Sequence, residues 1–170
     1  MKFLFDPSSN ELASLDVTER VARTLFLFFV TCAFAFAVWR VSDETGMKPD
    51  DVKDYYGESD PDDMFDAVPS ITKKRLVEVT HVHIFMIPTV FFLVSLMVVK
   101  SGLKPKFALP LIVFGFLSVG MDLSSMWLTR FVNANFVYGI VLSGTIMSGS
   151  MGLMILSCLK AMWLDKPGDA

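Results

Sequence analysis

The stretch from Val79 to Val99, VTHVHIFMIPTVFFLVSLMVV, decides the fold class. Two histidines are its only titratable side chains. Charged residues bound it on both sides, with Lys73, Lys74 and Arg75 before it and Lys100 after it. A helix of about 20 apolar residues is long enough to cross a bilayer core about 30 Å thick. The stretch therefore predicts a transmembrane helix.

Three other stretches share this apolar character, at residues 21–39, 107–128 and 136–159. Apolar residues make up 53% of the chain, which is more than a soluble domain usually carries. A segment in lipid must satisfy its own backbone hydrogen bonds, so each stretch should be helical. We predict an all-α fold, an integral membrane four-helix bundle with an acidic periplasmic loop between spans 1 and 2.

The spans divide the chain into three parts. Residues 1–20 form a cytoplasmic N-terminal segment, in which we expect a short surface helix before the first span. Residues 21–165 form the transmembrane domain, and this includes an outer loop at 42–78 that we expect to be partly irregular. Residues 166–170 form a tail.

Basic residues in short loops mark the cytoplasmic side of a membrane protein. The turn with Lys100, Lys104 and Lys106 therefore predicts a multi-pass protein of the bacterial inner membrane with both termini in the cytoplasm. The cluster at 73–75 argues against this orientation. Ten of the eighteen acidic residues lie between Asp43 and Asp66, in the outer loop. This loop is either a solvated acidic surface or a docking surface for a basic periplasmic electron carrier. No strongly basic patch is present, which excludes nucleic acid as a partner.

The polar residues inside the spans are few. His81 and His83 are the only histidines, and Asp122 is the only acid well inside an apolar stretch. Placing such a group in the membrane costs roughly 3 kcal/mol, so it normally faces the bundle interior and has a partner. His83 follows Arg75 by eight residues and Asp122 precedes Arg130 by eight, so both should lie about 12 Å below these anchors on antiparallel helices. The depths predict a contact between His83 and Asp122.

The helical periodicity constrains these side chains further. Residues two apart point about 200° from each other, so only one histidine can face the core of a regular helix, and His83 is the better candidate. A helix that begins after His83 would instead allow both to bind one ion. Ser118 and Ser125 share a stripe with Asp122 at helical spacing, and this stripe should face the interior.

Three interpretations of this group remain open. The first is a transition-metal ion held by His81, His83 and Asp122, since imidazole and carboxylate are common ligands. The second is haem b, with axial ligands among His81, His83 and methionines, or from the histidines of two protomers. The third has no cofactor and treats His83 and Asp122 as a hydrogen-bonded pair that fixes helix register. We expect four residues around the ligands: Glu78, Ser118, Ser125 and Met126.

Small residues recur every four positions in the last span, at Gly144, Ser148 and Gly152. Such residues let helices approach closely in lipid. We expect this face to pack against a neighbour, either inside the bundle, in another membrane protein or in a homodimer.

Three segments carry a resemblance to a protein family: Tyr55-Tyr56-Gly57-Glu58, Leu76-Val77-Glu78-Val79-Thr80-His81-Val82-His83-Ile84-Phe85, and Trp127-Leu128-Thr129-Arg130-Phe131. Over residues 50–150 the chain resembles a family of small, uncharacterised bacterial four-span inner-membrane proteins with a THxHxF motif. The resemblance implies an accessory membrane component of a respiratory or cytochrome-containing system and a role for both histidines.

These observations favour an accessory subunit in electron transfer that binds haem b or a transition metal near the periplasmic face. The alternative is a non-enzymatic assembly or scaffold subunit. A small proton-coupled carrier that uses Asp122 is a third interpretation, although the spans contain no internal repeat. Phosphate-binding loops, serine nucleophile motifs, CxxC pairs and HExxH are absent from the sequence, so we expect no independent enzymatic activity.

Overall fold

The computed structural model describes residues 10–45, 48–56 and 70–165. These ranges are almost entirely helical and contain no β-strand, only an isolated bridge between Asn10 and Ser101. The acidic run from Glu58 to Asp63 and the predicted tail lie outside them. There are four long helices: α1 (Val17–Thr45), α3 (Lys73–Val99), α4 (Pro105–Phe131) and α5 (Val137–Trp163). Three short ones accompany them: η1 (Glu11–Ser14), α2 (Pro49–Tyr56) and η2 (Ala134–Phe136).

All four long helices are long and apolar enough to cross a membrane. This confirms the prediction of an all-α membrane bundle, and the chain is a multi-pass membrane protein. The helices extend beyond most of the predicted span ends, because polar residues next to the apolar stretches stay helical. The first helix, for example, begins at Val17 and ends at Thr45, whereas its apolar stretch covers 21–39.

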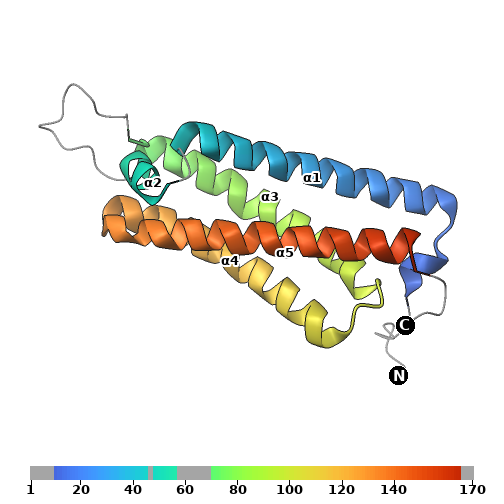
Figure 1. Cartoon of the computed structure of the whole chain (residues 1–170). Helices are drawn as coiled ribbons and strands as arrows, with labels where there is room; N and C mark the ends of the chain where they lie inside the picture. Colours follow the sequence, from blue (N-terminus) through green and yellow to red (C-terminus); the bar gives the residue numbers. More distant parts are fainter. Residues whose placement is uncertain (1–9, 46–47, 57–69, 166–170) are drawn as a thin grey trace, which may run out of the picture.

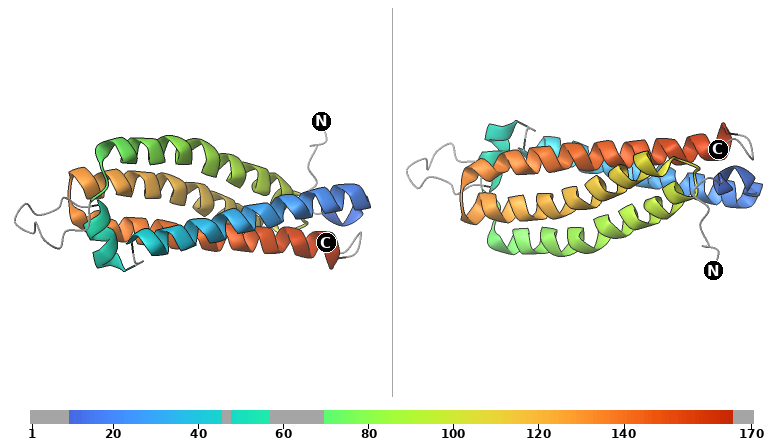
Figure 2. Two further views of the ribbon diagram at one scale, coloured as in Figure 1. Left: turned by 90° about the horizontal axis from the view of Figure 1, so that it is seen from above. Right: turned by 90° about the horizontal axis from the view of Figure 1, so that it is seen from below.

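The long helices run side by side along one axis (Figure 1). Helix α2 lies across one end of the bundle, which we call the α2 end. The 3-10 helix η1 lies at the opposite end, which we call the η1 end, beside the last turn of α5 (Figures 1 and 2). Helices α4 and α5 form the most extensive contact, and α1 is the least buried of the four.

Phe91 of α3 is the largest fully buried side chain of the core. Its ring packs against Phe34 of α1, with centroids 6.4 Å apart, and against Phe116 of α4, at 5.9 Å. A Cβ added at Gly115 of α4 would lie only 2.5 Å from this ring. The close approach of α3 and α4 therefore depends on a residue without a side chain at this position.

The η1 segment is buried against the bundle, in contrast to the surface helix that we expected before the first span. Leu12 is fully buried, and its backbone N–H donates to the carbonyl of Lys100 at 3.2 Å. The ammonium of Lys100 in turn forms an ion pair with Glu11 at 2.9 Å. Asn10 is also buried and donates from its side chain to the carbonyl of Ala161 at 3.4 Å. These contacts join η1 to the α3–α4 turn and to the end of α5.

Helix α2 closes the other end of the bundle. Its Val52 is buried, and the carbonyl of Tyr55 accepts a hydrogen bond from the backbone N–H of Ile71 at 2.8 Å. Ile71, Leu76 and Met126 form a small core here, against which Tyr55 and Tyr56 pack. Part of the predicted irregular loop is thus an ordered helix that covers the α2 end.

Candidate functional site

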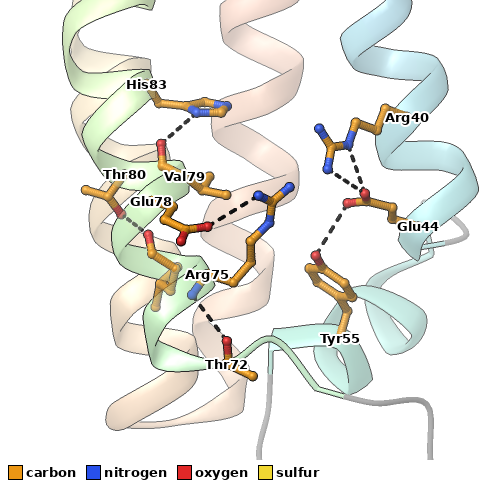
Figure 3. Close-up of polar contacts among 10 residues, drawn as sticks. Arg40, Glu44, Tyr55, Thr72, Arg75, Glu78, Val79, Thr80 and His83 are labelled. Carbon is orange, nitrogen blue, oxygen red and sulfur yellow. Dashed lines mark hydrogen bonds and ion pairs between the residues drawn. The ribbon is translucent and has the colours of Figure 1, made fainter.

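His83 lies in the third turn of α3, near the α2 end. The helix begins at Lys73, and the side-chain oxygen of Thr72 just before it accepts from the N–H of Arg75 at 3.2 Å and caps the first turn. Figure 3 shows the imidazole of His83 extending from α3 toward the side on which α1 lies. Its Nδ1 lies 2.8 Å from the carbonyl oxygen of Val79. A carbonyl only accepts, so Nδ1 donates in this hydrogen bond, and in the neutral imidazole Nε2 is then the nitrogen with a lone pair.

His81 has a different environment from His83. It is exposed, and its ring packs edge-on against Phe85 at a centroid distance of 5.4 Å. Helix α3 is regular through both positions, so the two imidazoles point in different directions. The interpretation in which both histidines bind one ion within a single chain requires a helix that begins after His83, and α3 begins at Lys73.

Asp122 is buried in α4, at 6% exposure. Its carboxylate accepts a hydrogen bond of 2.9 Å from the hydroxyl of Ser143, a fully buried residue of α5. The same hydroxyl lies 2.9 Å from the carbonyl of Ile140. The hydrogen bond of His83 goes to the carbonyl of Val79 and not to Asp122. The hydrogen-bond partner of Asp122 is therefore Ser143, a residue that sequence reasoning had not assigned to the site.

Tyr56 of α2 is the second residue that sequence reasoning did not place here. Burial, together with the nearby carboxylate of Asp122, raises the pKa of Tyr56. The end of α2 therefore lies near Asp122, on the side of the α2 end. The sequence offered one signal for this contact, because Tyr55 and Tyr56 end a short segment that carries Val52 one helical turn earlier.

The four residues expected around the ligands have separate environments. Ser118 is buried and donates to the carbonyl of Gly115 at 2.7 Å. Ser125 is buried against Gly139 of α5, and Met126 belongs to the small core at the α2 end. Glu78 is exposed and forms an ion pair with Arg75 at 3.5 Å. The stripe of Ser118, Asp122 and Ser125 faces the interior, as its spacing predicts.

The sequence matches the model of a family described as a transmembrane helical domain, over residues 46–169. The chain belongs to this family. No curated protein and no solved structure matches the chain. The family domain covers α2, α3, α4 and α5, whereas α1 precedes it. His83, Asp122, Ser143 and Tyr56 are thus all residues of the family domain.

A polar contact joins α1 to helix α2 of the family domain at the α2 end of the bundle. Arg40 and Glu44 of α1 form an ion pair at 2.8 Å, and the hydroxyl of Tyr55 in α2 donates to Glu44 at 3.4 Å (Figure 3). Burial is the main cause that raises the pKa of Tyr55, and the charge of Glu44 adds to it. The phenol of Tyr55 therefore stays protonated and can keep donating to Glu44.

The family domain also carries a shallow groove between α3 and α4. The indole N–H of Trp127 donates to the hydroxyl of Thr80 at 2.9 Å and joins the two helices. The groove is lined by Thr80, Ile84, Leu123, Ser124, Trp127 and Leu128. Its lining is mainly apolar, which fits a surface in contact with lipid.

The donor atoms of the family domain limit which metal ions or cofactors it can bind. Among the described residues, no group of three or more histidine, cysteine, aspartate or glutamate side chains is arranged to bind a metal ion. His83 offers one imidazole nitrogen beyond the one bonded to Val79, and the carboxylate of Asp122 is already bonded to Ser143. This arrangement can supply one axial ligand to a haem, or one or two ligands to an ion that takes the others elsewhere.

Proposed function

We propose that the chain is an accessory subunit of a bacterial inner membrane that binds haem b or a transition-metal ion through His83 and takes part in respiratory electron transfer. The hydrogen bond from Nδ1 of His83 to the carbonyl of Val79 carries this proposal. Histidines that bind metals almost always donate their other N–H to a carbonyl, a carboxylate or water, which fixes the ring and the tautomer. His83 has this orientation, and Nε2 is the nitrogen that would bind the metal.

The donors available favour haem over a bare ion within one chain. A haem needs one or two axial ligands, so His83 would serve as one, with the other from a methionine or from His83 of a second copy. A tetrahedral zinc or copper ion needs three or four donors, and His83 with Asp122 supplies two at most. Such an ion would therefore take further ligands from a second copy. When bound, either group supplies a one-electron centre or a Lewis acid. The protein orients the imidazole of His83, and Ser143 donates a hydrogen bond to the carboxylate of Asp122.

We place the α2 end at the periplasmic face. The turn with Lys100, Lys104 and Lys106 lies at the η1 end, and basic residues in short loops mark the cytoplasmic side. Both termini are then cytoplasmic. Helix α2 carries exposed Asp50, Asp51 and Asp54 on the periplasmic side, which suit the docking of a basic electron carrier.

An absorption spectrum with metal analysis on the detergent-purified protein tests this proposal. We expect either a Soret band with close to one haem per chain or per dimer, or a stoichiometric transition metal. A protein that shows neither after expression with added haem and iron contradicts it.

The open face of α5 favours a second function, that of an assembly subunit. A Cβ added at Gly144, Gly149 or Gly152 would meet no atom within 4 Å of its position, so the fold leaves this stripe uncovered. We propose that a second copy or another membrane protein packs there, through Gly144, Ser148 and Gly152.

Replacing Gly144 and Gly152 together with leucine tests this second function. Crosslinked or co-purified complexes should fall several-fold in the double variant, while its melting temperature stays unchanged because no contact within the chain is disturbed. Gly120→Leu is the matched control, since Gly120 is equally open but lies on α4. Equal losses in both variants would contradict a specific role for the α5 face.

A further inference from the structure

The first turns of α1 and the last turns of α5 form a corner at the η1 end, where the two helices lie side by side in both views of Figure 2. Arg20, Arg23 and Thr24 fall on one face of α1, since residues three and four apart share a helix face. Trp163 of α5 meets this face. Its indole N–H donates to the hydroxyl of Thr24 at 3.0 Å, and half of the residue remains exposed. The indole of Trp163 is thus held in place by Thr24, and half of the residue is exposed at this corner.

The guanidinium of Arg20 lies over the ring of Trp163. Its Cζ lies 5.7 Å from the centre of the Trp163 ring, and its Nη2 donates to the carbonyl of Ala13 at 2.8 Å. Its Nε is buried without a hydrogen-bond partner in the described part of the chain. The hydrogen-bonding capacity of this cation is therefore only partly used.

Two further cations lie in the same corner. Arg23 is half-buried and follows Arg20 by three residues, so it lies on the same face of α1. Lys160 of α5 is exposed and contacts Asp165 at 3.6 Å. Within residues 10–45, 48–56 and 70–165, neither Arg20 nor Arg23 forms an ion pair.

The described acidic residues nearby form no ion pair with these two guanidinium groups. The Asp16 carboxylate accepts from the backbone N–H of Glu19 at 2.8 Å and so serves the start of α1, and the Glu19 side chain is exposed. Glu11 pairs with Lys100 at the α3–α4 turn. In the described part of the chain, the only ion pair of this corner is therefore that of Lys160 with Asp165.

We infer that this corner binds the headgroup phosphate of an anionic phospholipid through Arg20 and Arg23, with Lys160 at its edge. Guanidinium groups bind phosphate oxygens with paired, charge-assisted hydrogen bonds. Tryptophan is enriched at the level of the headgroups, where an indole has an apolar and a polar neighbour. The corner lies at the end of two spanning helices, which places it at this level. Basic pockets between spanning helices are a recurring form of lipid headgroup site.

Thermal unfolding of the full chain in a neutral detergent tests the inference. Phosphatidylglycerol should raise the melting temperature by several degrees, and phosphatidylcholine at the same concentration should not. Arg23→Gln should lose most of this shift. Lys106→Gln is the matched control, because Lys106 is at the same end but lies over Phe107 at 5.0 Å on α4, away from the corner. It should keep the full shift.

Three results would overturn the inference. Equal shifts from the two lipids would show that the headgroup charge has no role. A shift from inorganic phosphate as large as that from phosphatidylglycerol would identify a free-anion site. An equal loss in Lys106→Gln would show that the whole basic end acts without a specific corner.

A second measurement does not depend on the stability of the variants. Trp39 and Trp127 can be replaced with phenylalanine, which leaves Trp163 as the only indole. Brominated phosphatidylglycerol should quench Trp163 fluorescence several-fold more than brominated phosphatidylcholine. Equal quenching contradicts the inference, whatever the melting data show.

Discussion

Ser143 of α5 donates a hydrogen bond of 2.9 Å to the buried carboxylate of Asp122 on α4. This contact joins the two most extensively packed helices and satisfies the one acidic side chain deep in the spans. It also explains how Asp122 can be buried without a hydrogen bond to His83. The rest of the polar group at the α2 end is arranged around this pair.

Replacing Ser143 should weaken the bundle because it leaves a buried acceptor without its donor. We expect Ser143→Ala to lower the free energy of unfolding by about 1 kcal/mol, as measured for interhelical hydrogen bonds in membranes. Ser157→Ala is the matched control, since Ser157 bonds only to the carbonyl of Leu153 in its own helix. Unfolding in detergent with added denaturant measures both. Equal effects of the two variants would show that the bond to Asp122 contributes nothing to stability.

The contact of α4 with α5 also depends on Gly139. A Cβ at this position would collide with the hydroxyl of Ser125, whereas one at Gly149 would meet nothing within 4 Å. Gly139→Val should destabilise the fold by about 1–3 kcal/mol, the usual cost of overpacking. Gly149→Val should change stability far less. A similar melting temperature for the two variants would contradict the packing of these helices described above.

Tyr56 gives the fold a defined dependence on alkaline pH. Its pKa is raised above 10.0 by burial and by Asp122. Below pH 10 both folded and unfolded chains hold the phenolic proton, so this group adds no pH dependence. Above pH 10 the unfolded chain loses the proton first and binds fewer protons than the folded chain, so stability falls as pH rises. Tyr56→Phe should therefore lose less stability than the wild type between pH 8 and pH 11. An identical loss in both proteins would show that the phenol of Tyr56 is not buried in the folded chain.

The α3–α4 turn requires a glycine at position 102. Gly102 has φ of +70°, and a Cβ there would lie 3.1 Å from that of Asn10. Gly102→Ala should cost about 1–2 kcal/mol through the left-handed conformation alone. Gly120→Ala is the control, because that position is helical and open, and alanine is favoured there. The melting temperature should fall in the first variant only, and a fall in neither would contradict the turn geometry.

Hydropathy predicted the four long helices because the length of an apolar run relates directly to membrane thickness. Helical spacing also predicted that Ser118, Asp122 and Ser125 face inward and that His81 and His83 diverge. The partner of Asp122 could not be predicted, because the sequence of α5 has small residues around its whole circumference and does not fix its rotation. Ser143 was therefore indistinguishable from Ser148, which is exposed.

The short segments outside the spans were predicted least well. We expected residues 42–78 to be a partly irregular acidic loop and did not predict α2, which forms within them because Val52, Tyr55 and Tyr56 can be buried against the bundle. Likewise, Leu12 lies in a short segment with only two other apolar residues, Ala13 and Leu15, and its burial depends on the α3–α4 turn, which is distant in sequence. Contacts of this kind are set by tertiary structure and leave no local periodicity.

The central claim is that His83, and not His81, presents the metal-binding nitrogen. The most direct test compares haem and metal content per chain in His83→Ala and His81→Ala, purified under identical conditions. The structure predicts that His83→Ala loses the bound group, whereas His81→Ala, an exposed position packed on Phe85, keeps it at the wild-type level. Full retention in His83→Ala would contradict the account.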